Sequence, residues 1–248
     1  MIILRQKTRM GKNIVLGSGS AGFSLVELMV VLFLTAISAI VMYRSYLAMQ
    51  VGVEVQAREA ELHQNMRVGI DRLAESLRMA GYKPFQQGMP SAETGFTVAD
   101  SNTVRITTDF NGDNDIVDSN FNGEPFSDDD VTFAWSGLDG APLRRNDNGA
   151  CPPPNECWQN IIPNISSLNF VYLDRNGSVL TAPVALGIMT DIRQVEVAVV
   201  VRASAEDYSY TNGETYNNLQ GTLLAFGNND NFRRRLVTAR VKIRNMGL

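Results

Sequence analysis

Hydrophobic residues form one long continuous run near the N-terminus of the chain. No charged residue occurs from Leu28 to Tyr43, and the wider stretch from Phe23 to Tyr43 contains only Glu27. Because a helix rises about 1.5 Å per residue, about 20 residues are needed to cross about 30 Å of hydrocarbon. The run has this length, and it therefore predicts a membrane-spanning helix.

Past this run the hydrophobic positions recur at helical spacing. They lie three, four or seven residues apart, with charged side chains such as Arg67 and Asp71 between them, which is typical of a helix with one apolar face. Gly81 provides a natural stop. We expect a single helix from Phe23 to about Ala80, about 87 Å long. The apolar positions of its second half are Val55, Leu62, Met66, Ile70, Leu73 and Leu77.

After Tyr82 the hydrophobic period changes to two, which indicates strands. A further signal is the stretch from Asp174 to Gly177 between two apolar runs, because Asn-Gly tolerates the positive φ of a hairpin turn. A helix followed by strands predicts an α+β fold. The alternating sets are Val104 and Ile106, Val131 and Phe133, Val195 to Val201, and Ala239 to Ile243, the last interleaved with Arg240, Lys242 and Arg244 on a wet, basic face.

Charge is distributed unevenly along the chain. Residues 1–22 contain four basic residues and no acid, whereas the remainder has 18 basic against 26 acidic residues. The positive-inside bias places the N-terminus in the cytoplasm and everything after about Tyr46 outside. The acidic excess of the remainder argues against a surface that neutralises phosphates, so we expect no nucleic-acid partner.

The residues around the start of the apolar run resemble a known processing site. The stretch from Gly22 to Leu28, after a basic leader, is similar to the site at which prepilin peptidase cuts after the glycine and methylates the next residue. The resemblance implies cleavage between Gly22 and Phe23, and it implies that Glu27 pairs with the N-terminal amine of a neighbouring subunit. A lone carboxylate costs about 2.5 to 3.5 kcal/mol at a membrane centre, so a partner is expected. The alternative is a plain single-pass anchor with Glu27 at the cytoplasmic interface, about 6 Å into the helix.

Two later segments narrow the resemblance. Leu77 to Tyr82 and Arg233 to Asn245 are similar to the helix end and C-terminal strand of PilW-type minor pilins, whose close relative is the J-type pseudopilin of type II secretion. The resemblance implies a pilin fold, in which the second half of the helix packs on an antiparallel sheet. It also implies a leader (1–22), a transmembrane helix (23–47), an exported half-helix (48–81) and a β-rich exported domain (82–248). A start at Met10 would keep the same cut.

The function implied by this resemblance is structural. We expect an inner-membrane protein that prepilin peptidase processes and that joins other major and minor pilins, at or near the tip of a type IV pilus, to prime assembly. One alternative is a type II secretion pseudopilin. The other is a membrane-tethered calcium-binding or adhesive domain that never assembles and is not cleaved after Gly22.

Enzyme chemistry finds little support in the sequence. His63 is the only histidine, and it falls one position off the apolar stripe, so we interpret it as a surface residue. No nucleophile elbow, P-loop or His-Glu-x-x-His pattern occurs.

Cys151 and Cys157 lie in an oxidising compartment if the topology above holds, and we expect them to form a disulfide that shapes a short loop.

Acidic residues gather between Asp109 and Asp130, where no Lys or Arg occurs. The spacing from Asp118 to Asp129 reproduces that of a calcium loop, with Gly123 at the sharp turn and aspartate in place of the closing glutamate. Pro125 and the lack of flanking helices argue against an EF-hand, and a solvated acidic loop is the alternative. The candidate ligands are Asp118, Asn120, Asn122, Asp129 and the Glu124 carbonyl, with Asp109, Asn111, Asp113 and Asp115 as a second set.

We predict that the exported part of the chain, beginning near Gln56, binds calcium weakly. Crowded carboxylates raise one another's pKa and oppose a compact loop, and a divalent cation reverses both effects. Calorimetry should give a Kd of about 10⁻⁴ to 10⁻³ M, and millimolar calcium should raise the melting temperature. No binding heat and an unmoved melting temperature would leave only a solvated acidic loop.

Overall fold

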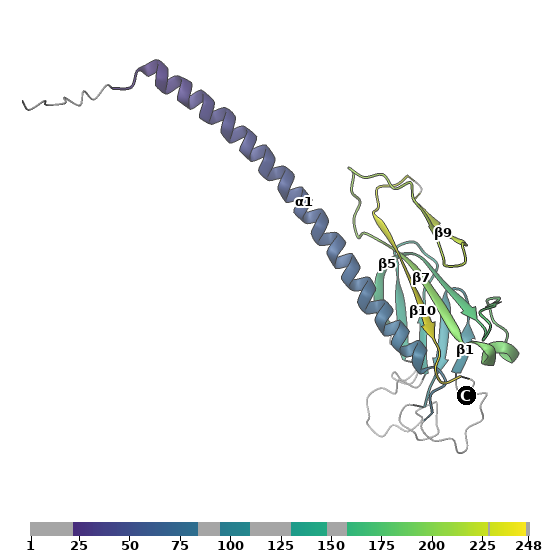
Figure 1. Ribbon diagram of the computed structural model, residues 1–248. Helices are drawn as coiled ribbons and strands as arrows, with labels where there is room; N and C mark the ends of the chain where they lie inside the picture. The colour runs from purple at the N-terminus through teal and green to yellow at the C-terminus, as the bar shows by residue number, and fades with distance from the viewer. Residues whose placement is uncertain (1–21, 84–94, 110–129, 148–157, 228, 247–248) are drawn as a thin grey trace, which may run out of the picture. The chain divides into compact units, whose positions relative to one another are not determined.

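The computed structural model describes residues 22–83, 95–109, 130–147, 158–227 and 229–246 (Figure 1). The chain divides into two compact units, Met1–Glu54 and Val55–Leu248. The described part of the first unit is the first half of a long helix. The second unit contains the rest of that helix and all the described strands.

The long helix, α1 (Leu25–Met79), has 55 residues. Gly81 follows it with φ +74°, a left-handed conformation that glycine adopts without a Cβ penalty. The chain turns there because the Tyr82 N–H donates to the Met79 carbonyl at 2.8 Å, and the Gly81 N–H donates to the Thr107 carbonyl at 3.1 Å. The expected helix and its glycine stop are therefore confirmed, to within two residues at each end.

All the strands belong to two antiparallel sheets. The larger has the order β1-β2-β3-β4-β5-β7-β10, with β6 paired to the end of β5, and the smaller is the hairpin β8-β9. The predicted period-two segments correspond to β2, β3, β7 and β10, whereas β1, β4, β8 and β9 were not predicted. The elements are β1 (Gly95–Ala99), β2 (Thr103–Thr107), β3 (Asp130–Ala134), β4 (Ala141–Asp147), β5 (Trp158–Leu173), β6 (Val179–Leu180), the 3₁₀ helix η1 (Leu186–Asp191), β7 (Gln194–Arg202), β8 (Thr215–Asn217), β9 (Leu223–Phe226) and β10 (Arg234–Lys242).

The predicted hairpin turn lies between β5 and β6. Gly177 takes the positive φ, +80°, and its N–H donates to the Asp174 carbonyl at 3.2 Å. The Asp174 carboxylate also accepts hydrogen bonds from the backbone N–H groups of Asn176 and Ser178, both at 2.8 Å. The aspartate side chain therefore fixes the turn, and glycine alone supplies its left-handed residue.

The second half of α1 packs its apolar stripe on one face of the large sheet. Met66, Ile70, Leu73 and Leu77 are buried, at 7% exposure or less, and Leu62 is half-buried. Complete burial of such a side chain is worth about 1.5 to 3 kcal/mol, so this contact holds the helix to the sheet. The side chain of Val55, also in the predicted stripe, lies outside the described residues. The α+β prediction is confirmed.

The small hairpin packs on the opposite face of the large sheet. Asn218 in its turn donates to the Asn169 side chain of β5 at 2.9 Å, and Gln220 donates to the Glu196 carboxylate of β7 at 2.8 Å. Glu196 is 2% exposed and also accepts a hydrogen bond from Arg240 Nε at 2.7 Å. The buried carboxylate is therefore both ion-paired and hydrogen-bonded, as burial of a charge requires.

Gly69 marks the closest approach of α1 to the sheet. A Cβ at this position would lie 2.2 Å from the Ile162 Cγ1 atom of β5 and 3.1 Å from the Ile161 carbonyl oxygen. Real Cβ atoms do not come so close to a carbon atom, so only glycine fits without a shift of the helix or of Ile162. At Gly52, by contrast, a Cβ would meet no atom within 4 Å.

We predict that Gly69→Ala destabilises the protein although alanine is the better helix former. Alanine gains about 1 kcal/mol of helix propensity, but overpacking against Ile162 costs about 1 to 3 kcal/mol. Thermal unfolding of the detergent-solubilised chain, followed by near-UV circular dichroism, measures the change. Gly52→Ala is the matched control and should leave the melting temperature unchanged or higher. Equal behaviour of the two variants would contradict the close approach at Gly69.

Candidate functional site

The start of α1 is built by a side-chain cap. The Ser24 hydroxyl accepts a hydrogen bond from the Glu27 N–H at 3.2 Å, and the Ser24 carbonyl accepts one from the Leu28 N–H at 3.1 Å. Serine satisfies a helix N–H group that has no partner within the helix, which is why the helix begins at Leu25. Glu27 then lies in the first turn, where a negative charge is favourable.

Gly22 and Phe23 precede this cap in solvent-exposed chain outside the helix. A Cβ on Gly22 would meet no atom within 4 Å, and Gly22 is not among the residues with positive φ. Nothing in the fold therefore requires glycine at this position. Phe23 is 83% exposed, so its ring contributes nothing to a core. Both residues are available to a second protein.

The apolar part of α1 is exposed along its whole length. Leu25–Gln50, 26 residues, is long and apolar enough to cross a membrane, a criterion of length and composition alone. Two of its hydroxyl groups donate within the helix, since Thr35 donates to the Leu32 carbonyl and Ser38 to the Leu34 carbonyl, both at 2.9 Å. Such internal bonds suit a segment that has no water around it.

The Glu27 carboxylate differs from these hydroxyl groups. Only its backbone N–H is engaged, in the cap, and the carboxylate forms no hydrogen bond or ion pair with any residue in the described part of the chain. A carboxylate in an apolar environment needs a cation or hydrogen-bond donors. Any such partner therefore comes from outside the described part of the chain.

The predicted calcium ligands fall almost entirely in residues 110–129, outside the described ranges. Asp109 alone is described: it is buried, and its N–H donates to the Tyr82 carbonyl at 2.8 Å. Residues 22–83, 95–109, 130–147, 158–227 and 229–246 contain no group of three or more His, Cys, Asp or Glu placed to hold a metal. Cys151 and Cys157 also lie outside these ranges. Calcium binding and the disulfide remain predictions. His63 is exposed on α1, as expected for a surface residue.

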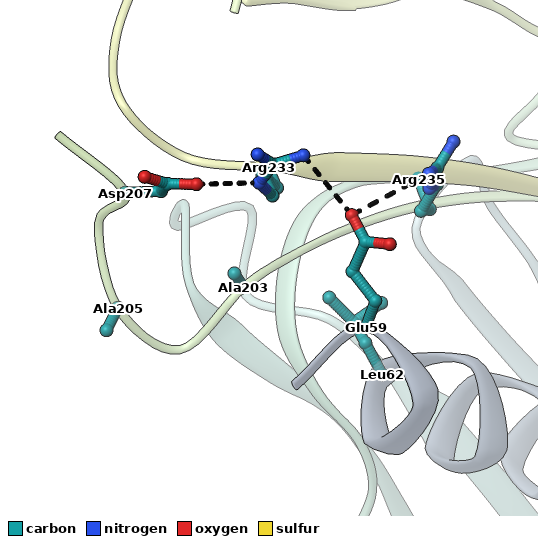
Figure 2. Close-up of a pocket in the computed structure, with 7 residues that line it drawn as sticks. All are labelled: Glu59, Leu62, Ala203, Ala205, Asp207, Arg233 and Arg235. Atoms are coloured by element: carbon teal, nitrogen blue, oxygen red, sulfur yellow. Dashed lines mark hydrogen bonds and ion pairs between the residues drawn. The ribbon is translucent and has the colours of Figure 1, made fainter. Parts of the chain in front are cut away.

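A small charged pocket lies within the second unit, where α1 faces the start of β10 (Figure 2). The Glu59 carboxylate on α1 accepts a hydrogen bond from Arg233 at 3.3 Å and lies 3.9 Å from the Arg235 guanidinium. Arg233 also donates to Asp207 at 2.9 Å and lies over the Tyr210 ring, 4.5 Å from its centre. Each charge is compensated inside the pocket. The arrangement therefore ties α1 to the loop after β7.

A second charged cluster fixes the segment before β10. Asp230 accepts two hydrogen bonds from Arg234, both at 2.6 Å, and the Arg234 side chain is 4% exposed. These bonds, together with one from the Phe232 N–H, lower the pKa of Asp230. The Ser209 hydroxyl and the Arg233 guanidinium likewise lower the pKa of Asp207 in the neighbouring pocket.

Sequence reasoning missed the contact between Glu59 and Arg233 because the two residues lie far apart along the chain. Glu59 and Arg233 are separated by 174 positions, and on the helix Glu59 has the pattern of an ordinary solvent-facing residue. The only signal in the sequence was the basic run Arg233 to Arg235, whose charges need acidic partners. The sequence does not show which acidic residues these are. Gly22, Phe23 and Glu27 could be predicted as one group because they are consecutive or nearly so.

One comparison with known proteins concerns the N-terminal segment. A family model described as the prokaryotic N-terminal methylation motif matches residues 17–43, so the chain carries this type IV pilin signal. Among solved structures, a type IV-like pilin from Thermus thermophilus is similar over 75% of this chain and 97% of its own, with 14% identity and a TM-score of 0.45. No curated protein matches the chain.

We predict that Asp230→Asn lowers the stability of the protein at neutral pH and reduces the further loss of stability as the pH falls. Because the folded-state pKa of Asp230 is lowered, its contribution is complete above the usual carboxyl range near pH 4 and is lost as the pH falls toward the folded value. The variant leaves buried Arg234 without its charged partner, at a cost of about 1 to 3 kcal/mol. Its melting temperature should therefore fall less than that of the natural chain between about pH 4 and pH 2.

The measurement is thermal unfolding at a series of pH values in non-ionic detergent. Glu206→Gln is the control, because Glu206 is exposed and has no ion-pair partner among the described residues. It should change neither the melting temperature at pH 7 nor the acid dependence. An Asp230→Asn curve parallel to that of the natural chain would show that the Asp230 pair does not set the acid response.

Proposed function

We propose that this chain is a pilin-like subunit, processed between Gly22 and Phe23, anchored in the inner membrane by α1, and assembled with other pilins into a type IV pilus-type filament. The observation that carries the proposal is the methylation motif, residues 17–43, placed on a helix start whose Glu27 carboxylate is unpaired in the described chain. The exposed apolar length of α1 supports the same role.

Processing follows from the chemistry of the exposed segment. A peptidase must reach the bond that it cuts, and Gly22 and Phe23 are exposed and lie outside the helix. Hydrolysis of the amide bond leaves a carboxylate on Gly22 and an α-amine on Phe23. An α-amine has a pKa near 8 and is therefore cationic at neutral pH. N-methylation keeps the amine basic.

The new amine is the partner that Glu27 lacks. Opposite charges attract far more strongly in an apolar medium than in water, so an amine close to the carboxylate offsets the cost of placing Glu27 in the membrane. The Ser24 cap engages the backbone of Glu27 and leaves the carboxylate free for a second subunit. The pair would set the register of neighbouring helices, because Glu27 is the only acid from Phe23 to Tyr43.

Helix packing would supply most of the assembly energy. The side chains of Leu25–Gln50 are exposed throughout, so the segment is not packed against any described part of the chain. In a membrane, packing against other apolar helices replaces lipid contacts by close van der Waals contacts. The specific assignment, a PilW-type minor pilin at or near the tip, rests on the resemblance of Leu77 to Tyr82 and Arg233 to Asn245.

The second candidate is a type II secretion pseudopilin, which shares the processing site and the helix. The third is a membrane-tethered binding or adhesive domain that does not assemble, and it differs in predicting no cleavage after Gly22. Processing therefore separates the third candidate from the first two. Gene neighbours would separate the first from the second.

We predict that the mature chain begins at N-methylated Phe23 and that Glu27→Ala is cleaved normally but is incorporated into filaments at least tenfold less. The cut lies outside the helix, whereas the Glu27 carboxylate is needed only when subunits meet. N-terminal mass analysis of membrane-extracted protein measures processing, and quantitative immunoblotting of sheared filaments measures incorporation.

Ser24→Ala is the matched control, because it removes the helix cap, worth about 0.5 to 2 kcal/mol, and keeps the carboxylate. Its incorporation should stay near that of the natural chain. An intact leader in cells that contain prepilin peptidase would contradict the proposal as a whole. Normal incorporation of Glu27→Ala would contradict only the role of the carboxylate and would make Glu27 an interfacial residue.

A further inference from the structure

The large sheet has two edges that differ in what covers them. At the β1 edge, η1 and the segment before it lie alongside, and the Val184 N–H donates to the Ala99 carbonyl at 2.8 Å. The other edge is β10, a strand of nine residues that pairs with β7 without a bulge (Figure 1). An uncovered edge strand presents a row of backbone groups that another strand can pair with.

The hydrogen bonds at the two ends of β10 show which residues face outward. Next to β10, the Ala203 N–H donates to the Arg233 carbonyl at 2.8 Å, and the Ile243 N–H donates to the Arg193 carbonyl at 2.9 Å. In an antiparallel pair the bonded positions alternate, so the odd-numbered residues of β10 bond to β7. The N–H and C=O groups of the even-numbered residues therefore point to the outer edge.

The outward row is closed at one end and open along the rest. The Phe232 carbonyl accepts a hydrogen bond from the Asn212 side chain at 3.0 Å, and the Arg234 carbonyl accepts one from the Tyr216 hydroxyl at 3.5 Å. No backbone hydrogen bond is recorded in the described chain for the outward groups of the next even positions. These positions are Leu236, Thr238, Arg240 and Lys242.

The two faces of this edge have different chemistry. On the face opposite α1, the exposed cations Arg240, Lys242 and Arg244 follow one another at every second residue. Arg240 pairs with Glu196, whereas Lys242 and Arg244 have no ion-pair partner among the described residues. On the face toward α1, Val237 and Ala239 are half-buried and apolar.

We propose that the outer edge of β10 binds an extended segment of another protein in which acidic residues alternate with apolar ones. Such a segment would add a strand to the sheet through the four open backbone positions. Its acidic side chains would lie beside Arg240 and Lys242, and its apolar side chains would extend the surface of Val237 and Ala239, because paired strands share their faces.

A second copy of the same strand is a poor occupant. Pairing β10 with another β10 would bring the cations at positions 240, 242 and 244 of the two strands onto one face, and like charges across strands are destabilising. Cations on an edge also guard against such self-association. These cations repel basic strands but attract acidic ones, so the same residues select an acidic partner.

The pairing does not depend on the proposed function, because β10 lies in the second unit and takes no part in processing or in the membrane helix. The test therefore uses the full chain as single molecules in non-ionic detergent. The probe is a fluorescent peptide about as long as β10 in which valine alternates with glutamate. One comparison peptide has lysine in place of glutamate. A second keeps the composition of the probe but groups the valines together, so that valine and glutamate no longer alternate. Anisotropy measures binding.

Two pairs of variants separate charge from strand pairing. The double variant Lys242→Glu with Arg244→Glu should weaken binding of the acidic peptide at least tenfold. Its control makes the same charge change at two exposed arginines elsewhere, Arg144→Glu with Arg175→Glu, and should leave binding of the peptide unchanged. Thr238→Pro removes one outward N–H and should also weaken binding at least tenfold, whereas Thr238→Ala keeps the N–H and should bind as the natural chain does.

Amide exchange provides a readout that does not require a variant to fold. In the natural chain, the acidic peptide should slow exchange at Leu236, Thr238, Arg240 and Lys242 and leave Val237 and Ala239 unchanged. Equal binding of the acidic and lysine peptides, or no added protection at the even positions, would overturn the proposal. The chain should also be tested for binding to anionic lipid vesicles. If it binds them, and if Lys242→Glu with Arg244→Glu abolishes this binding whereas Thr238→Pro does not, the cations form a lipid-binding surface instead.

Discussion

The apolar stripe of α1 against the large sheet is the contact on which the second unit depends. It covers one face of a seven-strand path, and Gly69 lets the helix backbone approach Ile162 closely. A sheet of this size with both faces open would expose a wide apolar surface to water. The helix closes one face, and the small β8-β9 hairpin packs on part of the other.

Packing on the face opposite α1 constrains the charged residues. A side chain on this face would be exposed to water if nothing packed on it. The hairpin turn packs there, and Glu196 is buried between that turn and β10. Each charge so placed needs a partner of opposite sign nearby. Arg240 supplies it for Glu196, Asp230 supplies it for Arg234, and Arg233 joins Glu59 to Asp207. The basic residues near the C-terminus therefore stabilise the packing of elements that are remote in sequence.

The two candidate interaction regions use different physical means. The start of α1 presents a carboxylate that is unpaired in the described part of the chain, and in the proposed membrane setting a single cation would have a large effect because an apolar medium screens little. The edge of β10 lies among water-exposed side chains, where charge mainly selects the partner and backbone hydrogen bonds fix its register. Because one region is in the first unit and the other in the second, assembly through the helix and capture of a strand are compatible in one molecule.

The sequence by itself determined the features that depend on near neighbours. The apolar run, the helical stripe, the Gly81 stop, the Asp174 turn and the N-terminal methylation motif all rest on residues a few positions apart, where helix, strand and turn geometry fixes which side chains meet. Only the tertiary structure decided that Gly69 touches Ile162, that Glu59 meets Arg233, and that β10 rather than an inner strand forms the open edge. Those outcomes depend on strand order and on contacts between residues up to 174 positions apart, which no local spacing specifies.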